Sequence, residues 1–272
     1  MIITGGRLAL PGEDEPVRAD LHITDGRISA IERTDARRPA AGGAGTAGRP
    51  AEEVIDASGL LVLPGAVDPH VHFDEPGYTD REDFFHGSSA AASGGVTTVI
   101  DMPCTSVPPV TSRENLNRKL AVISTRAVVD FGLYGGVSGQ VLSDRPQKAI
   151  EELSDHVLGY KCYFISGMDT FTRVDHRQFQ DVLRMVKDVN RPVLLHAEDY
   201  DYITRATPLA EAKGSSPSDY HDSRPAEAEV LAILAAAELA SITGASLHIV
   251  HVSTSRGAQI IARTPGVTGE TG

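Results

Sequence analysis

Residues 61–77 read Leu-Val-Leu-Pro-Gly-Ala-Val-Asp-Pro-His-Val-His-Phe-Asp-Glu-Pro-Gly, an apolar run that ends in His70-Val-His72 and a Pro/Gly loop. The apolar, β-branched first half predicts a buried parallel strand. Because side chains alternate along a strand, His70 and His72 point to one face, where two imidazoles can hold a metal ion. The same spacing is compatible with two hydrogen-bonded core histidines, so the rest of the chain must decide between these interpretations.

The composition restricts the kind of protein that this chain can be. With 272 residues, 41% of them hydrophobic, it is long enough for one large α/β barrel or two ordinary domains. The formal charge of -12, from 25 Lys and Arg against 37 Asp and Glu, disfavours nucleic acid and anionic membranes as partners. The sequence shows no membrane span and no export leader, so we expect a cytoplasmic protein in which Cys104 and Cys162 are reduced.

The first 56 residues differ in pattern from the rest. Alternating apolar and polar residues in 1–8 and 21–31 predict short strands, and the Asp25-Gly26 pair predicts a hairpin turn. Residues 38–51, rich in Ala, Gly and Pro, are interpreted as a surface loop. We therefore expect a small β unit over residues 1–56 and a separate domain over residues 57–272.

From residue 57 onward, apolar strands alternate with helical segments. Strands are predicted at 61–72, 95–102, 128–135, 159–164, 191–197, 246–252 and 266–272. Ser112, Asp175 and Pro225 stand at predicted helix starts. Repeated βα units give a parallel sheet, and polar residues at the ends of several strands favour a (β/α)8 barrel of the TIM type. A doubly wound sheet would carry a Gly-rich phosphate loop after its first strand, and this chain has none there.

Five side chains remain as candidate site residues. They are His70, His72, Lys161, His196 and His251, all in or at the ends of predicted strands. The other histidines fall in helices, in the N-terminal unit, in a polar insertion or, for His248, on the opposite face of a strand. Burial of Lys161 among aromatic residues would lower the pKa of its ammonium and leave a nucleophilic amine. That amine can form a Schiff base with a carbonyl compound or a carbamate with carbon dioxide. The alternative is that the lysine side chain extends to solvent at the strand end and has no such role.

Separately placed motifs resemble those of the cyclic amidohydrolases, the group of dihydroorotase, hydantoinase (dihydropyrimidinase) and allantoinase. The motifs lie at 64–72, 94–98, 101–103, 159–161, 195–198 and 248–253. The resemblance implies a metal-dependent hydrolase barrel with a flanking β-sandwich, of which residues 1–56 are the N-terminal portion. It also implies two divalent metal ions, His70 and His72 on one, His196 and His251 on the other, and a carboxylated Lys161 bridging both. Zinc suits these ligands, and manganese, iron or cobalt are compatible with them.

One part of the family pattern has no counterpart in the sequence. The family places an aspartate at the end of the eighth strand as metal ligand and general base, whereas this chain ends at Gly272, within the predicted seventh strand. No catalytic residue is therefore assigned, and we expect a barrel that is incomplete after about strand 6 or 7. We also expect the chain to be part of a longer homo-oligomeric enzyme, a dimer or tetramer, and to be inactive by itself.

The substrate implied by the motifs is a small neutral cyclic ureide. Dihydroorotases of this group carry Arg and Asn where this chain has Asp74 and Cys104, so their carboxylate clamp is absent. Hydantoinases carry a tyrosine where this chain has Ser166. The motifs are most similar to those of allantoinase, which predicts hydrolysis of allantoin to allantoate, with Asp74, Ser166 and Gly167 as candidate substrate contacts. The alternatives are dihydroorotase or hydantoinase activity, a non-catalytic scaffold subunit, and a Schiff-base aldolase that uses Lys161.

Overall fold

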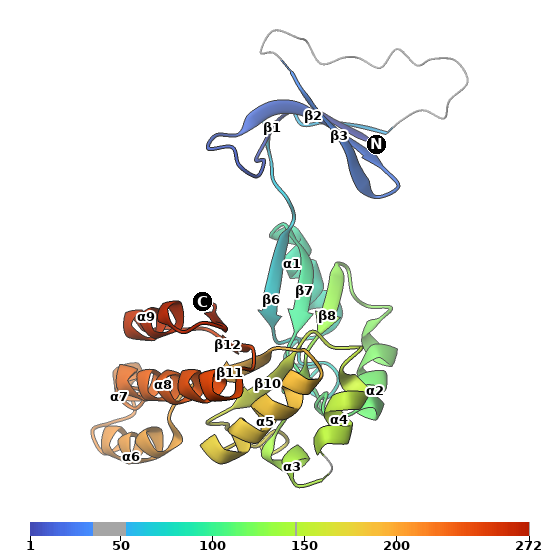
Figure 1. Cartoon of the computed structure of the whole chain (residues 1–272). Helices are drawn as coiled ribbons and strands as arrows, with labels where there is room; N and C mark the ends of the chain where they lie inside the picture. Colours follow the sequence, from blue (N-terminus) through green and yellow to red (C-terminus); the bar gives the residue numbers. More distant parts are fainter. Residues whose placement is uncertain (35–52, 145, 272) are drawn as a thin grey trace. The chain divides into compact units, whose positions relative to one another are not determined.

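The computed structural model divides the chain into two compact units, Met1–Gly65 and Ala66–Gly272 (Figure 1). The residues that it describes are 1–34, 53–144 and 146–271. The surface loop expected at 38–51 lies outside these described residues. Each unit has its own sheet and its own core, so the two are described separately.

The first unit is a five-stranded mixed sheet. Its strands are β1 (Ile2–Leu8), β2 (Val17–Thr24), β3 (Arg27–Arg33), β4 (Val54–Asp56) and β5 (Leu61–Val62). Asp25 and Gly26 both have positive φ, 51° and 71°, and form the predicted tight turn of the β2–β3 hairpin. One face of the sheet packs Leu8, Ala19 and Leu21 together. These residues build a small core of the kind that the alternating pattern predicted.

The stretch predicted as a single buried strand, residues 61–72, is divided in the structure. Leu61 and Val62 form β5, which pairs in parallel with β1, and a new strand, β6 (Ala66–Val71), begins after Gly65. Leu61 and Leu63 are 52% and 61% exposed, so the prediction that this half is buried is wrong. An apolar run specifies a strand but not the sheet that it joins. Because β5 pairs with β1, the first unit extends to Gly65, beyond the expected end at residue 56.

The second unit repeats strand and helix, and all of its paired strands are parallel. The strands are β6, β7 (Val96–Asp101), β8 (Asp130–Leu133), β9 (Gly135–Gly136), β10 (Tyr160–Tyr163), β11 (Val193–His196), β12 (Leu247–Ile249) and β13 (Val267–Gly269). Strands β6 to β8 form one sheet and β9 to β13 another, each in chain order. Only Tyr134 separates β8 from β9 in the chain, so the end of one sheet leads directly into the start of the other. This is the predicted α/β architecture of an incomplete TIM-type barrel.

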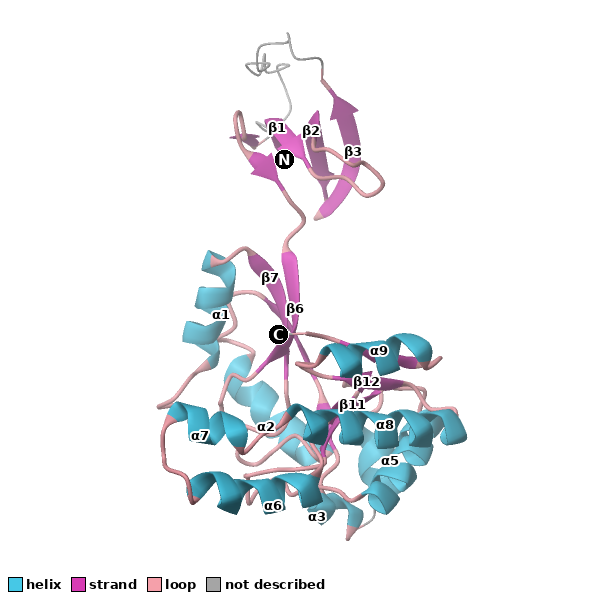
Figure 2. Ribbon diagram, turned by 90° about the vertical axis from the view of Figure 1, so that its left-hand side faces the viewer, coloured by secondary structure: helices cyan, strands magenta, loops and turns pink. Residues whose placement is uncertain are grey.

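Helices connect these strands and cover them. They are α1 (Phe84–Ser93), α2 (Arg113–Ile123), α3 (Gly139–Leu142), α4 (Pro146–Leu153), α5 (His176–Asp188), α6 (Tyr200–Glu211), α7 (Pro217–Asp222), α8 (Ala226–Thr243) and α9 (Ser255–Arg263). As predicted, Ser112 and Asp175 cap α2 and α5 by accepting backbone N–H bonds, and Pro225 precedes α8. Helix α5 packs against β11 and α8 against β12, and both helices can be followed in Figures 1 and 2.

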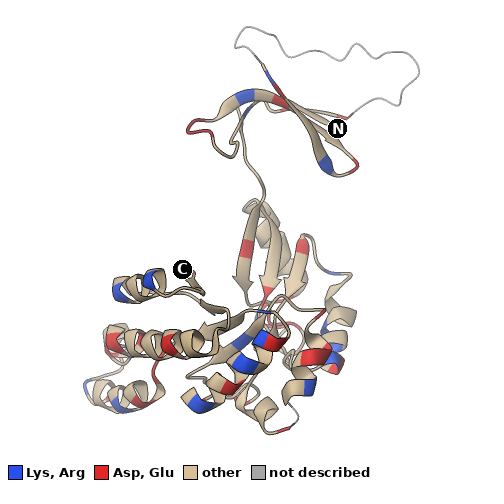
Figure 3. Ribbon diagram, in the orientation of Figure 1, with Lys and Arg blue, Asp and Glu red and all other residues tan. Residues whose placement is uncertain are grey.

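The second unit carries charged residues on its helices and has a large apolar core. Residues of both charge signs lie on its helices, among them α4 and α5 (Figure 3). Its main core packs aromatic and branched side chains of strands and helices, such as Phe84, Phe179 and Leu195. Cys104 and Cys162 are buried free thiols, as predicted. Among the described residues, no helix combines the length and the apolar character needed to cross a membrane.

Candidate metal centre

The four histidines singled out in the sequence lie together at the ends of the barrel strands. His70 is the next-to-last residue of β6 and His72 follows that strand, His196 ends β11, and His251 lies two residues beyond β12. The ring centroids of His70 and His251 are 5.6 Å apart, and those of His196 and His251 are 4.7 Å apart. Parallel strands bring residues that are far apart in sequence to one edge, where barrel enzymes place their sites.

The imidazoles form two pairs whose ring nitrogens face each other. Nε2 of His70 and Nε2 of His72 are 3.3 Å apart, and Nδ1 of His196 and Nε2 of His251 are 2.9 Å apart. Two nitrogens that bind a tetrahedral zinc ion at about 2.0–2.1 Å are about 3.3–3.4 Å from each other, and a ligand angle of about 90° gives about 2.9 Å. Each pair therefore fits two ligands of one ion.

Three of these rings are also held through their other nitrogen. Nδ1 of His70 contacts the Glu270 carboxylate, and Nδ1 of His72 lies 3.4 Å from the Thr105 hydroxyl. Nε2 of His196 lies 2.9 Å from Oε2 of Glu198. Such partners fix the tautomer and the orientation of metal-binding histidines. No pattern in the sequence predicts these roles for Glu198, Thr105 or Glu270.

Lys161 is fully buried in β10, and its Nζ has no hydrogen-bond partner among the residues that the structure describes. The Nζ atom lies 5.1 Å from the centroid of the Tyr163 ring. Burial lowers the pKa of Lys161 to about 8, although Cys104 and Glu270 oppose that shift. The alternative that the side chain reaches solvent is therefore wrong. An amine in this position, without a partner, is available for covalent modification.

Burial and nearby charges favour the neutral form of His72 and His251, which is the form that binds metals. Burial, followed by the charges of His70 and Lys161, lowers the pKa of His72 to about 3. Burial, followed by His196 and Lys161, lowers the pKa of His251 to about 4. In the described part of the chain, no three His, Cys, Asp or Glu side chains are arranged to hold one ion. Each histidine pair therefore needs a further ligand, and Lys161 is the remaining candidate predicted from the sequence.

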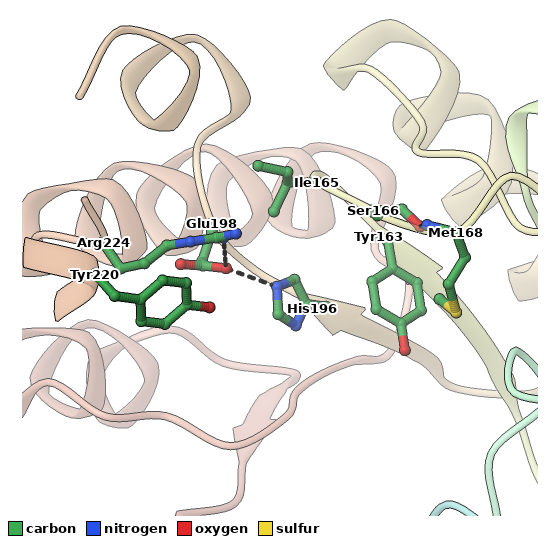
Figure 4. Close-up of a pocket in the computed structure, with 9 residues that line it drawn as sticks. Tyr163, Ile165, Ser166, Met168, His196, Glu198, Tyr220 and Arg224 are labelled. Carbon is green, nitrogen blue, oxygen red and sulfur yellow. Dashed lines mark hydrogen bonds and ion pairs between the residues drawn. The ribbon is translucent and has the colours of Figure 1, made fainter. Parts of the chain in front are cut away.

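A cavity of about 290 Å³ opens beside His196 (Figure 4). Its lining residues are Tyr163, Ile165, Ser166, Gly167, Met168, His196, Glu198, Tyr220 and Arg224. Glu198 bridges the site, because the same carboxylate oxygen meets His196 and accepts a 2.9 Å hydrogen bond from Nη1 of Arg224. Burial raises the pKa of Glu198, but the contacts with His196 and Arg224 outweigh it and leave that pKa below its ordinary value.

Of the three predicted substrate contacts, two line the cavity beside His196 and one does not. Ser166 and Gly167 line the cavity beside His196, and the Ser166 hydroxyl donates to the main-chain oxygen of Phe171 at 2.7 Å. Asp74 is buried, and its carboxylate forms a 3.3 Å ion pair with Arg81. Asp74 is not among the residues that line this cavity.

His248 takes part in the site only indirectly. Its Nε2 lies 3.3 Å from the Glu270 carboxylate, which also contacts His70, and its Nδ1 lies 2.8 Å from the Thr268 hydroxyl.

A second cavity, of about 600 Å³, is lined by His70, His72, His251 and Glu270 together with Asp68, Pro69 and Thr271. Glu270 therefore connects the last described strand with the first barrel strand.

A partial parallel βα barrel with titratable side chains at its strand ends has the arrangement in which TIM-type barrels place their sites. The chain belongs to the amidohydrolase family, whose family model matches residues 61–267. It is 40% identical to an allantoinase of Rubrobacter xylanophilus over 266 residues, which are 96% of this chain and 54% of that protein. It is 37% identical to a dihydroorotase of Methanosarcina mazei over 202 residues, 74% of this chain and 42% of that protein.

The chain is also similar to solved structures of hydantoinases. The L-hydantoinase (dihydropyrimidinase) of Arthrobacter aurescens superimposes with a TM-score of 0.84 and 27% identity, over 100% of this chain and 58% of that one. The chain therefore spans about half the length of the curated relatives and solved structures that it matches. The resemblance to cyclic amidohydrolases inferred from the sequence is confirmed.

Proposed function

We propose that the protein is a binuclear-metal hydrolase that opens a cyclic ureide ring and converts allantoin to allantoate. The observation that carries this proposal is the combination of two pairs of facing imidazole nitrogens with a buried lysine whose amine has no partner. The similarity to allantoinases directs the choice of substrate.

The residues present fit two divalent ions. His70 and His72 would hold one ion and His196 and His251 the other, while Lys161, carboxylated by carbon dioxide, would bridge both. Carboxylation forms an N–C bond between the neutral amine and carbon dioxide and releases one proton, so it converts an amine without a partner into a group with two ligand oxygens. Zinc suits this mixed nitrogen and oxygen set, and manganese, iron or cobalt are compatible with it. The chemistry that such a centre supplies is activation of water near neutral pH and polarisation of a carbonyl.

The surrounding residues position these groups and select the substrate. Glu198 orients His196, and Ser166 and Gly167 line the cavity in which the ureide would lie. The cavity contains one guanidinium, that of Arg224, and its charge is compensated by Glu198. A compensated cation attracts a carboxylate substrate only weakly, so the cavity suits a neutral ring better than dihydroorotate.

The experiment compares four substrates: allantoin, dihydroorotate, hydantoin and dihydrouracil. Turnover is measured with zinc-loaded protein of the length of the curated relatives, and the Lys161→Ala variant serves as the inactive control. We expect kcat/KM for allantoin to exceed the other values by at least about tenfold. A preference for dihydroorotate of that size would contradict the substrate assignment. Turnover no higher than the protein-free background for both the wild type and the variant would support the scaffold alternative.

A further inference from the structure

A second lysine, Lys119 of α2, is as deeply buried as Lys161 but differs from it in having polar partners. Its ammonium forms a 2.6 Å ion pair with Oδ2 of Asp101, although the contact lacks hydrogen-bond geometry. It also donates to the Ser106 hydroxyl at 2.5 Å and to the main-chain oxygen of Glu75 at 3.0 Å. Because three partners engage its Nζ, Lys119 is not free for covalent modification in the way that Lys161 is. The two buried lysines therefore have different tasks.

Lys119 reaches the loop that follows His72 in two ways, directly through the Glu75 carbonyl and indirectly through Asp101. Asp101, at the end of β7, accepts a 2.7 Å hydrogen bond from the backbone N–H of Phe73, the residue next to His72. Glu75, two residues further, accepts a 2.9 Å bond from the Phe84 N–H at the start of α1, and its carboxylate also pairs with Arg126. Phe73 and Glu75 are thus held by contacts with Asp101 of β7, with Phe84 of α1, with Arg126 and with Lys119.

The second loop that Lys119 contacts carries the neighbours of the His72 ring. The Thr105 hydroxyl lies 3.4 Å and the Cys104 sulfur 3.8 Å from Nδ1 of His72, and the next residue, Ser106, binds Lys119. The two loops also touch directly, because a Cβ at Gly77 would lie 2.5 Å from Cβ of Val107. One ammonium therefore holds both the backbone beyond His72 and the segment that contacts its ring.

We propose that Lys119 is a positioning residue, whose ammonium fixes the 72–78 and 104–107 loops against each other and thereby sets the orientation of His72. The part of this proposal that concerns metal affinity rests on the proposed function. Lys119 contacts no candidate ligand itself, and it acts through Asp101, Ser106 and the Glu75 carbonyl.

The test uses the 272-residue chain, the variants Lys119→Met and Lys119→Met/Asp101→Asn, and an exposed-lysine control, Lys148→Met. The double variant keeps an acceptor for the Phe73 N–H and removes the carboxylate that the single variant leaves buried without a counter-charge. Zinc affinity is measured by competition with a chromophoric chelator. Amide exchange of residues 72–78 is measured on metal-free protein, with β11 as the internal reference.

For both Lys119 variants, we expect the affinity for one zinc equivalent to fall about 10–100-fold while the other stays within about twofold. Exchange in residues 72–78 should accelerate at least about tenfold, with β11 unchanged. If the double variant shows wild-type affinity and wild-type exchange, Lys119 contributes only to stability and the proposal is overturned. If wild-type protein binds no zinc, the proposed function fails, and exchange decides the role of Lys119: acceleration supports positioning, and unchanged exchange overturns it.

Discussion

Replacing Lys161 with methionine is expected to stabilise the metal-free protein, although the same change removes the proposed bridging group. Methionine is similar in length, unbranched and apolar, so it can fill the space of the lysine chain. A buried polar group without a partner costs about 1–3 kcal/mol, and Nζ of Lys161 makes no hydrogen bond that the substitution would break. The contact between Nζ and the Tyr163 ring, at 5.1 Å, would be lost at a cost of about 0.5–1 kcal/mol. The expected net stabilisation therefore lies between about 0 and 2.5 kcal/mol.

The assay is equilibrium denaturation by urea in the presence of a chelator, so that metal binding does not contribute. Lys148→Met removes a lysine that is exposed on α4, and its free energy of unfolding should stay within about 0.5 kcal/mol of the wild-type value. Lys161 would be shown to stabilise the metal-free protein if Lys161→Met lowered its free energy of unfolding by more than about 1 kcal/mol, and the prediction would then be wrong. That result would mean that the amine has a stabilising partner.

Two further substitutions test the packing and the outer contacts of the site. Gly136→Ala would place a Cβ 2.4 Å from the Phe171 ring, so we expect a loss of about 1–3 kcal/mol in urea unfolding, whereas Gly167→Ala, with nothing within 4 Å, should be nearly neutral. Equal effects at both glycines would contradict the packing of β9. Glu198→Gln should weaken zinc binding about 10–100-fold by chelator competition, because the amide holds His196 and Arg224 less firmly than the carboxylate does. Unchanged affinity would show that Glu198 does not orient His196.

Local sequence patterns predicted the barrel and its histidines because both depend on periodicity. The His70-Val-His72 spacing placed two imidazoles on one face of a strand end, and His196 closes an apolar run that forms β11. The helix starts at Ser112 and Asp175 follow from side-chain capping, which is also a local effect.

The contacts that support the site depend on tertiary structure and were not predicted. Glu270 meets His70 from a position 200 residues away, and no local pattern specifies that pair. Lys119 did have a signal, since it shares the buried face of α2 with Leu116 and Ile123 at helical spacing. A lysine on an apolar helix face requires a buried counter-charge, but the sequence does not show that this partner is Asp101. The strand break at residues 63–65 was missed because β5 pairs with β1, a contact outside the barrel.

The chemical state of Lys161 in zinc-loaded protein tests most directly whether a carboxylated lysine bridges two metal ions. The purified chain is reconstituted with zinc and isotopically labelled bicarbonate, and its metal content and the labelled carbon are then determined. We expect two zinc ions per chain and a carbamate carbon that appears with the metal and is missing from the Lys161→Met variant. Zinc bound in equal amount by the wild type and the variant, with no carbamate in either, would contradict this expectation.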